Sequence, residues 1–170
     1  MTEAGKETRP LIRLPLSKLE KVLEIVAVIG ILAGFILIAS VWGDLSKQIP
    51  THFNLSGQPD DWGGKRSLVI VQIVVTVLYL LLTYVSRYPH QFNYPWRISG
   101  ENAAAQYRNA RQMLILVKTE MVVFFGYLLW ASIQVAYGKA QGLSGLFILI
   151  FLAIIIGTLS AYIMRGYKLR

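Results

Sequence analysis

The sequence predicts an all-α polytopic membrane protein, in which four transmembrane helices carry an ordered extracytoplasmic loop between the first and the second. Hydrophobic residues make up 55% of the 170 residues and charged residues only 15%, which is unlike a soluble domain. The mean hydropathy is +0.51. Polar segments separate four apolar runs, and about 20 apolar residues are enough to cross the hydrocarbon core of a bilayer.

Each helix has a local reason to begin where it is predicted. Ser17 and Glu20 have the spacing of a capping box, so the first helix should start there. Ser99 is placed to cap a helix that runs without a breaker into the third span. Gly30 and Gly34 favour close packing inside the bundle over dimerisation. The predicted spans cover residues 22–42, 67–86, 113–137 and 143–164, in one domain of residues 22–164.

The charge distribution predicts an orientation. Twelve of the Lys and Arg residues fall in the tails, residues 1–21 and 165–170, and in the segment of residues 87–112, whereas four fall in the other two connections. The positive-inside rule then places both termini in the cytoplasm. Since the cations flank apolar runs, the net charge of +8 indicates an anionic lipid surface and no nucleic acid. The chain has no cysteine, which excludes disulfides and thiol chemistry.

The outer loop, IPTHFNLSGQPDDWGGK, holds the first set of candidate residues. In an extended THFNL segment His52 and Asn54 share a face, and the turn-forming SGQPDD folds the aspartates back towards them. This group would suit a small polar ligand or a divalent metal, for which His52 and Asp60 are the candidates; no other cofactor is predicted. In the alternative interpretation, Asn54 and Asp60 cap turns and His52 bonds backbone. The predicted ligand or partner residues are His52, Asn54, Gly57, Asp60, Asp61 and Lys65.

Three charged residues lie inside predicted spans, where an unpaired charge costs roughly 2.5–3.5 kcal/mol. Glu24 and Lys118 lie at similar depths in the first and third helices, and Glu120 lies slightly deeper. These depths predict an interhelical ion pair between Glu24 and Lys118, with a proton or ion relay as the alternative.

The inner segment, beginning RYPHQFNYPWRI, resembles an interfacial aromatic belt. Tyr107 precedes Arg111 by one helical turn, so this face would bind lipid phosphate or a cytoplasmic protein, or simply anchor the helix. No phosphate loop, HExxH or GxSxG motif occurs, so no enzyme is expected. The inner candidates are His90, Asn93, Tyr94, Asn102, Tyr107 and Arg111.

Two segments together are similar to one known family. IPTHFNLSGQPDDWGGK and RYPHQFNYPWRISGENAAAQYRNARQMLILVK resemble parts of the "domain of unknown function 1648" membrane family, a likeness that covers residues 22–135. The sequence departs from that pattern at Asp61, where glycine is usual. It also lacks the additional C-terminal region of the SdpI-like proteins, whose N-terminal part belongs to this family. The matching positions are His52, Asn54, Gly57, Pro59, Asp60 and Lys65, and then Pro89, Phe92, Asn93, Tyr94, Pro95, Asn102 and Tyr107.

The resemblance implies a role without catalysis. The family includes the N-terminal part of SdpI-like proteins, which in bacilli are immunity and signal-transduction membrane proteins against a secreted toxin. We therefore expect a binding, signalling or immunity protein of a bacterial inner (plasma) membrane that recognises a peptide or protein through its outer HFNxxGxPD loop. The alternatives are an accessory subunit of a larger membrane complex and a small-solute or ion transporter that uses Glu24, Lys118 and Glu120.

Overall fold

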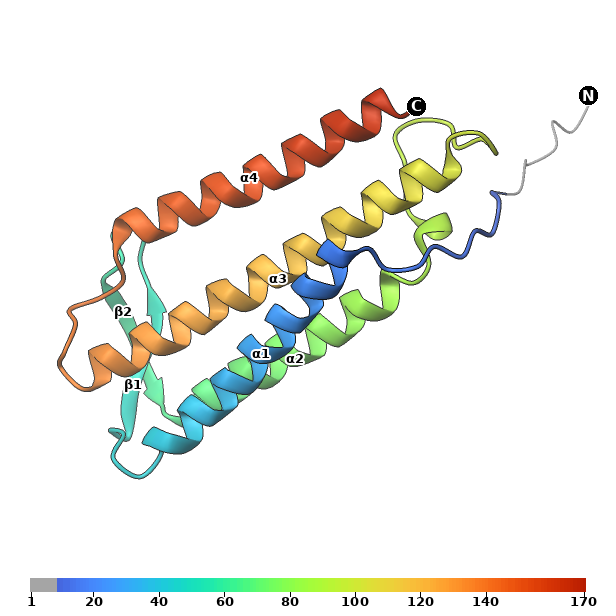
Figure 1. The fold of residues 1–170 in the computed structure, drawn as a ribbon. Coiled ribbons are helices and arrows are strands. Elements are labelled where there is room, and N and C mark those ends of the chain that lie inside the picture. The colour runs from blue at the N-terminus through green and yellow to red at the C-terminus, as the bar shows by residue number, and fades with distance from the viewer. Residues whose placement is uncertain (1–8) are drawn as a thin grey trace, which may run out of the picture.

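The computed structural model describes residues 9–170 and consists of four long helices with a two-stranded hairpin at one end (Figure 1). All four helices are long and apolar enough to cross a membrane, as expected for a multi-pass membrane protein, and they lie where the four spans are predicted. The elements are α1 Lys18–Val41, β1 Gln48–Phe53, β2 Pro59–Gly64, α2 Arg66–Val85, the 3-10 turn η1 Pro89–Gln91, α3 Ala103–Ala136 and α4 Gly145–Lys168.

The longest helix, α3, organises the bundle. It packs against α1 and α2 on one side and against α4 on the other, so that α4 stands apart from α1 and α2 (Figure 1). Only Gly166 of α4 is buried, which leaves most of that helix to face lipid or a partner. The midsection of the three-helix part is closed by a buried cluster of Ala27, Ile31, Val75, Tyr79 and Val122.

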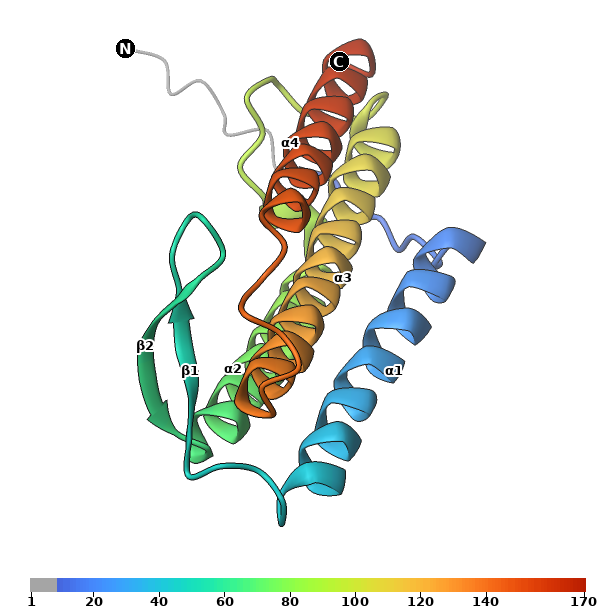
Figure 2. The same cartoon turned by 90° about the vertical axis from the view of Figure 1, so that its left-hand side faces the viewer.

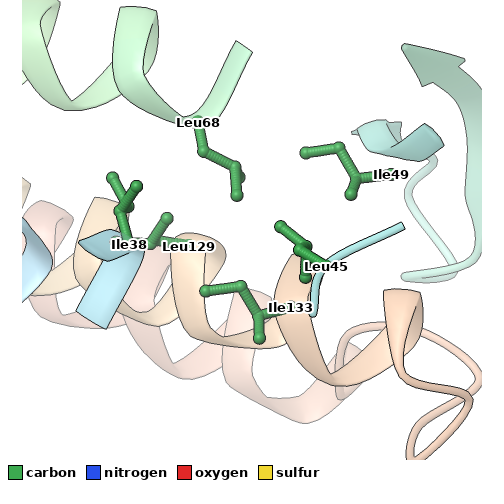
Figure 3. Close-up of a cluster of buried hydrophobic side chains, with 6 residues drawn as sticks. All are labelled: Ile38, Leu45, Ile49, Leu68, Leu129 and Ile133. Carbon is green, nitrogen blue, oxygen red and sulfur yellow. The ribbon is translucent and has the colours of Figure 1, made fainter. Parts of the chain in front are cut away.

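A second buried cluster lies at the hairpin end of the bundle (Figure 3). It joins the end of α1, the following loop, β1, the start of α2 and the later part of α3. The hairpin is thereby fixed to the helices through β1, and β2 is the outer strand (Figure 2). The cluster consists of Ile38, Leu45, Ile49, Leu68, Leu129 and Ile133.

The predicted helix starts have the expected chemistry. Ser17 N donates to Glu20 Oε2 at 2.6 Å and Glu20 N donates to Ser17 Oγ at 3.2 Å, which is the capping box. The same reciprocal pattern links Ser99 and Asn102, although the helix itself begins at Ala103. As predicted, α3 then continues without a break into the apolar run.

Gly30 and Gly34 both face the interior of the bundle, as expected for internal packing. A Cβ on Gly30 would lie 2.9 Å from Val122 Cγ1, and one on Gly34 would lie 2.7 Å from the amide of Gln72. That amide donates to the carbonyl of Ile31 at 3.0 Å, so the small residues let α2 approach α1 closely enough for a buried interhelical hydrogen bond.

Two features differ from the predicted fold. The all-α description omits the antiparallel pairing of β1 and β2, which forms because the turn at residues 54–58 reverses the chain. The connection from α3 to α4 is longer than the segment that separates the predicted spans 113–137 and 143–164. Helix α4 extends to Lys168, and basic residues suit the carboxyl end of a helix. Of the predicted N-terminal tail, residues 1–8 lie outside the described part of the chain.

Candidate functional site

The hairpin turn is built by one asparagine and one glycine. Asn54 Oδ1 accepts hydrogen bonds from the backbone amides of Ser56 and Gln58, both at 3.0 Å. Gly57 has a φ of +80°, a conformation that side chains with a Cβ rarely adopt. The predicted turn-capping role of Asn54 is therefore confirmed, and its side-chain oxygen is used within the turn.

The two aspartates fold back as the turn chemistry predicted. His52 Nδ1 lies 2.5 Å from Asp60 Oδ1, and Thr51 Oγ1 donates to Asp61 Oδ2 at 3.0 Å. His52 therefore pairs with a carboxylate, which corrects the interpretation that its ring bonds backbone. The His52 side chain is 66% exposed and that of Asp60 43%, so this pair faces the surroundings of the protein. It offers one nitrogen and carboxylate oxygens to a ligand.

A metal at this hairpin would find two protein ligands of the predicted type. Within residues 9–170, no three or more His, Cys, Asp or Glu side chains come together in a way that would hold a metal ion. Divalent metals in structural protein sites take four or more ligands. The arrangement of His52 and Asp60 is thus better suited to hydrogen bonding with a polar ligand.

Two of the predicted loop residues connect the hairpin to the helices. Lys65 Nζ donates to the carbonyl of Trp42 at 2.6 Å and lies 4.8 Å from the centroid of its indole ring, so it links the start of α2 to the end of α1. The carbonyl of Gly57 accepts from Leu143 N at 2.6 Å, which attaches the hairpin tip to the segment before α4. A Cβ at position 57 would overlap the Leu143 carbonyl oxygen.

A cavity of about 310 Å³ lies between the hairpin and the helices. Its walls are apolar side chains of β1, α3, α4 and the segment before α4, whereas Thr51, His52 and Asn54 are its polar residues. A smaller cavity of about 140 Å³ lies nearby against β1, α2 and α3. The apolar walls of the larger cavity are formed by Phe53, Leu55, Phe124, Leu128, Leu143 and Ile148.

The charged residues inside the helices separate into two groups. Lys118 Nζ lies 2.6 Å from Glu24 Oε1, which is the predicted interhelical pair, and Tyr79 OH donates to Glu24 Oε2 at 2.7 Å. Glu120 stands apart from this pair and accepts a hydrogen bond from Thr158 Oγ1 of α4 at 2.6 Å. The three residues therefore do not form one continuous chain of hydrogen bonds.

The inner segment holds a buried ion pair that the sequence did not indicate. Arg111 Nε lies 2.7 Å from Glu20 Oε1, and its two terminal nitrogens donate to the carbonyls of Leu14 and Pro15 at 2.7 and 3.0 Å. The prediction that Arg111 faces phosphate or a partner is wrong, because its guanidinium group holds the N-terminal segment against α3. The one local signal was the acidic capping residue Glu20.

The aromatic residues of the inner segment also pack inwards. Tyr107 is fully buried beside Tyr94, with 6.0 Å between the ring centroids, so it is not available to a ligand. Tyr94 OH donates to the carbonyl of Pro89 at 2.9 Å, and burial raises the pKa of this phenol above its usual range. Asn102 belongs to the helix start, and Asn93 remains exposed.

Arg9 fixes the segment before α1 to the same region. Its Nη1 donates to the carbonyl of His90 at 3.1 Å and to that of Phe92 at 2.6 Å, and its guanidinium lies 5.4 Å from the Tyr94 ring centroid. The segment before α1 is therefore held near both ends, by Arg9 and by Arg111.

Comparison with known proteins gave a family match for one part of the chain. Residues 29–76 match the family described as "Domain of unknown function (DUF1648)", from the middle of α1 through the hairpin to the middle of α2. This match does not extend to the inner segment that starts at Arg87, which belongs to the resemblance described above. Searches of curated proteins and of solved structures gave no significant match. The part of the chain that is centred on the β1–β2 hairpin is thus similar to the DUF1648 family.

Proposed function

We propose that this protein is a non-enzymatic membrane protein of the binding, signalling or immunity type, and that its β1–β2 hairpin recognises a peptide segment on the outer side of a bacterial inner membrane. The observation that carries the proposal is the cavity of about 310 Å³ between the hairpin and α3 and α4. Binding sites are commonly concave and apolar with a few polar groups that orient the ligand, and this cavity has that composition.

Three properties of the hairpin favour a peptide as the ligand. The outer strand, β2, has one backbone edge without a neighbouring strand in the described residues, and an extended peptide can add to such an edge. The exposed His52–Asp60 pair offers a donor and an acceptor beside an apolar cavity that would accept a ligand side chain. Leu55 at the tip is 94% exposed, which is typical of a contact residue more than of a packing residue.

The family match supports the choice of site. It is centred on the hairpin and includes only about half of each flanking helix. The resemblance of the same motif to SdpI-like proteins supports an immunity or signalling role, in which the hairpin binds a secreted peptide and the attached helices respond.

The proposal is tested by peptide selection. A phage-displayed library of random peptides is selected against the purified chain in lipid nanodiscs, with empty nanodiscs for counter-selection. We expect enriched peptides whose affinity falls about tenfold or more when His52 and Asp60 are both replaced by Ala, because hydrogen bonds to a binding site are typically worth that much. The measurement is the dissociation constant of one synthetic peptide for each variant.

A matched control separates the site from general charge effects. Asp44→Ala removes an exposed carboxylate from the same loop, outside the hairpin and its cavity, and should leave peptide affinity unchanged. Failure to enrich any peptide over empty nanodiscs, or equal weakening by Asp44→Ala and by the double change, would contradict recognition at the hairpin. Flux into proteoliposomes that depends on Glu24 or Glu120 would instead favour transport.

A further inference from the structure

A larger cavity lies at the opposite end of the bundle from the hairpin. It has a volume of about 390 Å³ and is bounded by the segment before α1, the start of α1, the end of α2 and the first part of α3. Its lining includes the charged residues Arg13, Glu24, Arg87 and Arg111 together with apolar residues such as Leu16. We propose that this cavity binds a phosphate group, as carried by the headgroup of an anionic phospholipid.

The charge balance of the lining favours an anion. Arg111 is neutralised by Glu20, and Glu24 is neutralised by Lys118. Arg13 and Arg87 are exposed and form no hydrogen bond or ion pair with any described residue. Among residues 9–170, the cavity therefore presents two cations, from two different chain segments, that lack a counter-charge.

The chemistry of those two cations suits phosphate. A guanidinium group presents planar, paired N–H donors that match two oxygens of one phosphate, and arginine is the usual residue for this contact. Arg13 lies on the segment that Arg9 and Arg111 fix in place, and Arg87 follows the C-cap residue of α2, where its backbone amide donates to the carbonyl of Tyr84. Both guanidinium groups thus start from backbone that already has a fixed position, which lowers the entropic cost of binding.

The surroundings of the cavity favour a lipid over a soluble anion. Leu16 belongs to the lining, and Leu11 and Leu19 expose apolar side chains on the same segment and on the first turn of α1. Acyl chains would cover these side chains while the headgroup occupies the cavity, whereas free phosphate would leave them uncovered. This inference does not depend on peptide recognition by the hairpin.

The test compares lipids that differ only in the headgroup. The detergent-purified full chain is titrated with phosphatidylglycerol and, separately, with phosphatidylcholine of the same acyl chains, and retained lipid is counted by native mass spectrometry. We expect preferential retention of phosphatidylglycerol, and about tenfold weaker retention in Arg13→Gln and in Arg87→Gln, because each change removes charge-assisted hydrogen bonds. Replacing both should abolish the preference over phosphatidylcholine.

Arg108→Gln is the matched control. Arg108 is an exposed cation in the first part of α3 and does not line the cavity, so its loss changes the net charge equally and should leave lipid retention unchanged. Competition with inorganic phosphate distinguishes the sources of the group: no displacement supports a lipid ligand, and displacement that depends on Arg13 and Arg87 supports a soluble phosphate in the same site. Equal retention by the double variant and by Arg108→Gln would overturn the proposal. Because Arg13 and Arg87 are exposed, their replacement should not unfold the chain, which the melting temperature checks.

Discussion

Replacing Glu24 by Gln should destabilise the folded bundle by about 3–5 kcal/mol, the usual cost of removing one partner from a buried ion pair. The side chain of Lys118 is fully buried and its ammonium group contacts Glu24 Oε1 and Thr83 Oγ1, each at 2.6 Å. Without the carboxylate, the charged Lys118 would remain inside an apolar bundle without a counter-charge. Its neighbours would be the Thr83 hydroxyl and the Tyr79 ring. The free energy of unfolding, measured by denaturant titration in mixed micelles, checks this.

A second substitution separates the ion pair from a simple packing defect. Adding Lys118→Met to Glu24→Gln removes the unpaired charge and should restore most of the lost stability, since an apolar side chain of similar length can replace the buried partner. Glu101→Gln is the control, because it removes an exposed carboxylate before α3. A neutral effect of Glu24→Gln would show that Glu24 does not stabilise the bundle, and a loss of stability without rescue would show that the unpaired lysine charge is not its cause.

Arg111→Gln should have an effect of similar size, about 3–5 kcal/mol, with an additional local consequence. The Glu20 side chain is fully buried and would lose its counter-charge. The carbonyls of Leu14 and Pro15 would lose their donors at the same time, so the segment before α1 should detach from α3. Unfolding in mixed micelles measures the loss of stability, and amide hydrogen exchange of residues 9–17 measures the detachment.

The matched control is again Arg108→Gln, which lies one turn earlier on the exposed side of α3. It should change neither the stability nor the exchange rates. If Arg111→Gln also leaves the exchange of residues 9–17 unchanged, then Arg9 alone holds the segment through the carbonyls of His90 and Phe92. Rescue by a second change, Glu20→Met, would attribute the loss to the unpaired carboxylate.

The helices and the Glu24–Lys118 pair were predictable because both follow from local patterns. A run of about 20 apolar residues has few structures open to it other than a spanning helix. Depth along a helix can be counted from its rise per residue, and two opposite charges at equal depth in neighbouring helices are strongly attracted in a medium of low dielectric constant. The contact at 2.6 Å between Lys118 Nζ and Glu24 Oε1 agrees with that reasoning.

The hairpin was only partly predictable. Asn54 and the sequence around Gly57 indicated a turn, and the return of Asp60 towards His52 followed from it. The paired strands did not, because β1 and β2 lack a regular alternation of apolar and polar residues, and each contains a proline. Their position is fixed instead by Ile49, which is buried among residues of α1, α2 and α3, and α3 lies far away in sequence.

The inner end of the bundle was the least predictable part. Glu20 was interpreted as a capping residue alone, but it also pairs with Arg111, which lies 91 positions later. No local periodicity indicates that a segment before a helix folds back against a different helix. The burial of Arg111 and the cavity that contains Arg13 and Arg87 both depend on that long-range contact.

Recognition at the hairpin requires that it lies on the side of the membrane opposite to the basic segments, and cysteine labelling tests this most directly. The chain has no native cysteine, so Leu55→Cys at the exposed tip and Glu101→Cys before α3 each provide a single thiol. We predict that a membrane-impermeant maleimide labels Leu55→Cys in intact cells and labels Glu101→Cys only after the membrane is opened. Labelling of Glu101→Cys in intact cells while Leu55→Cys stays protected would contradict an outward-facing hairpin.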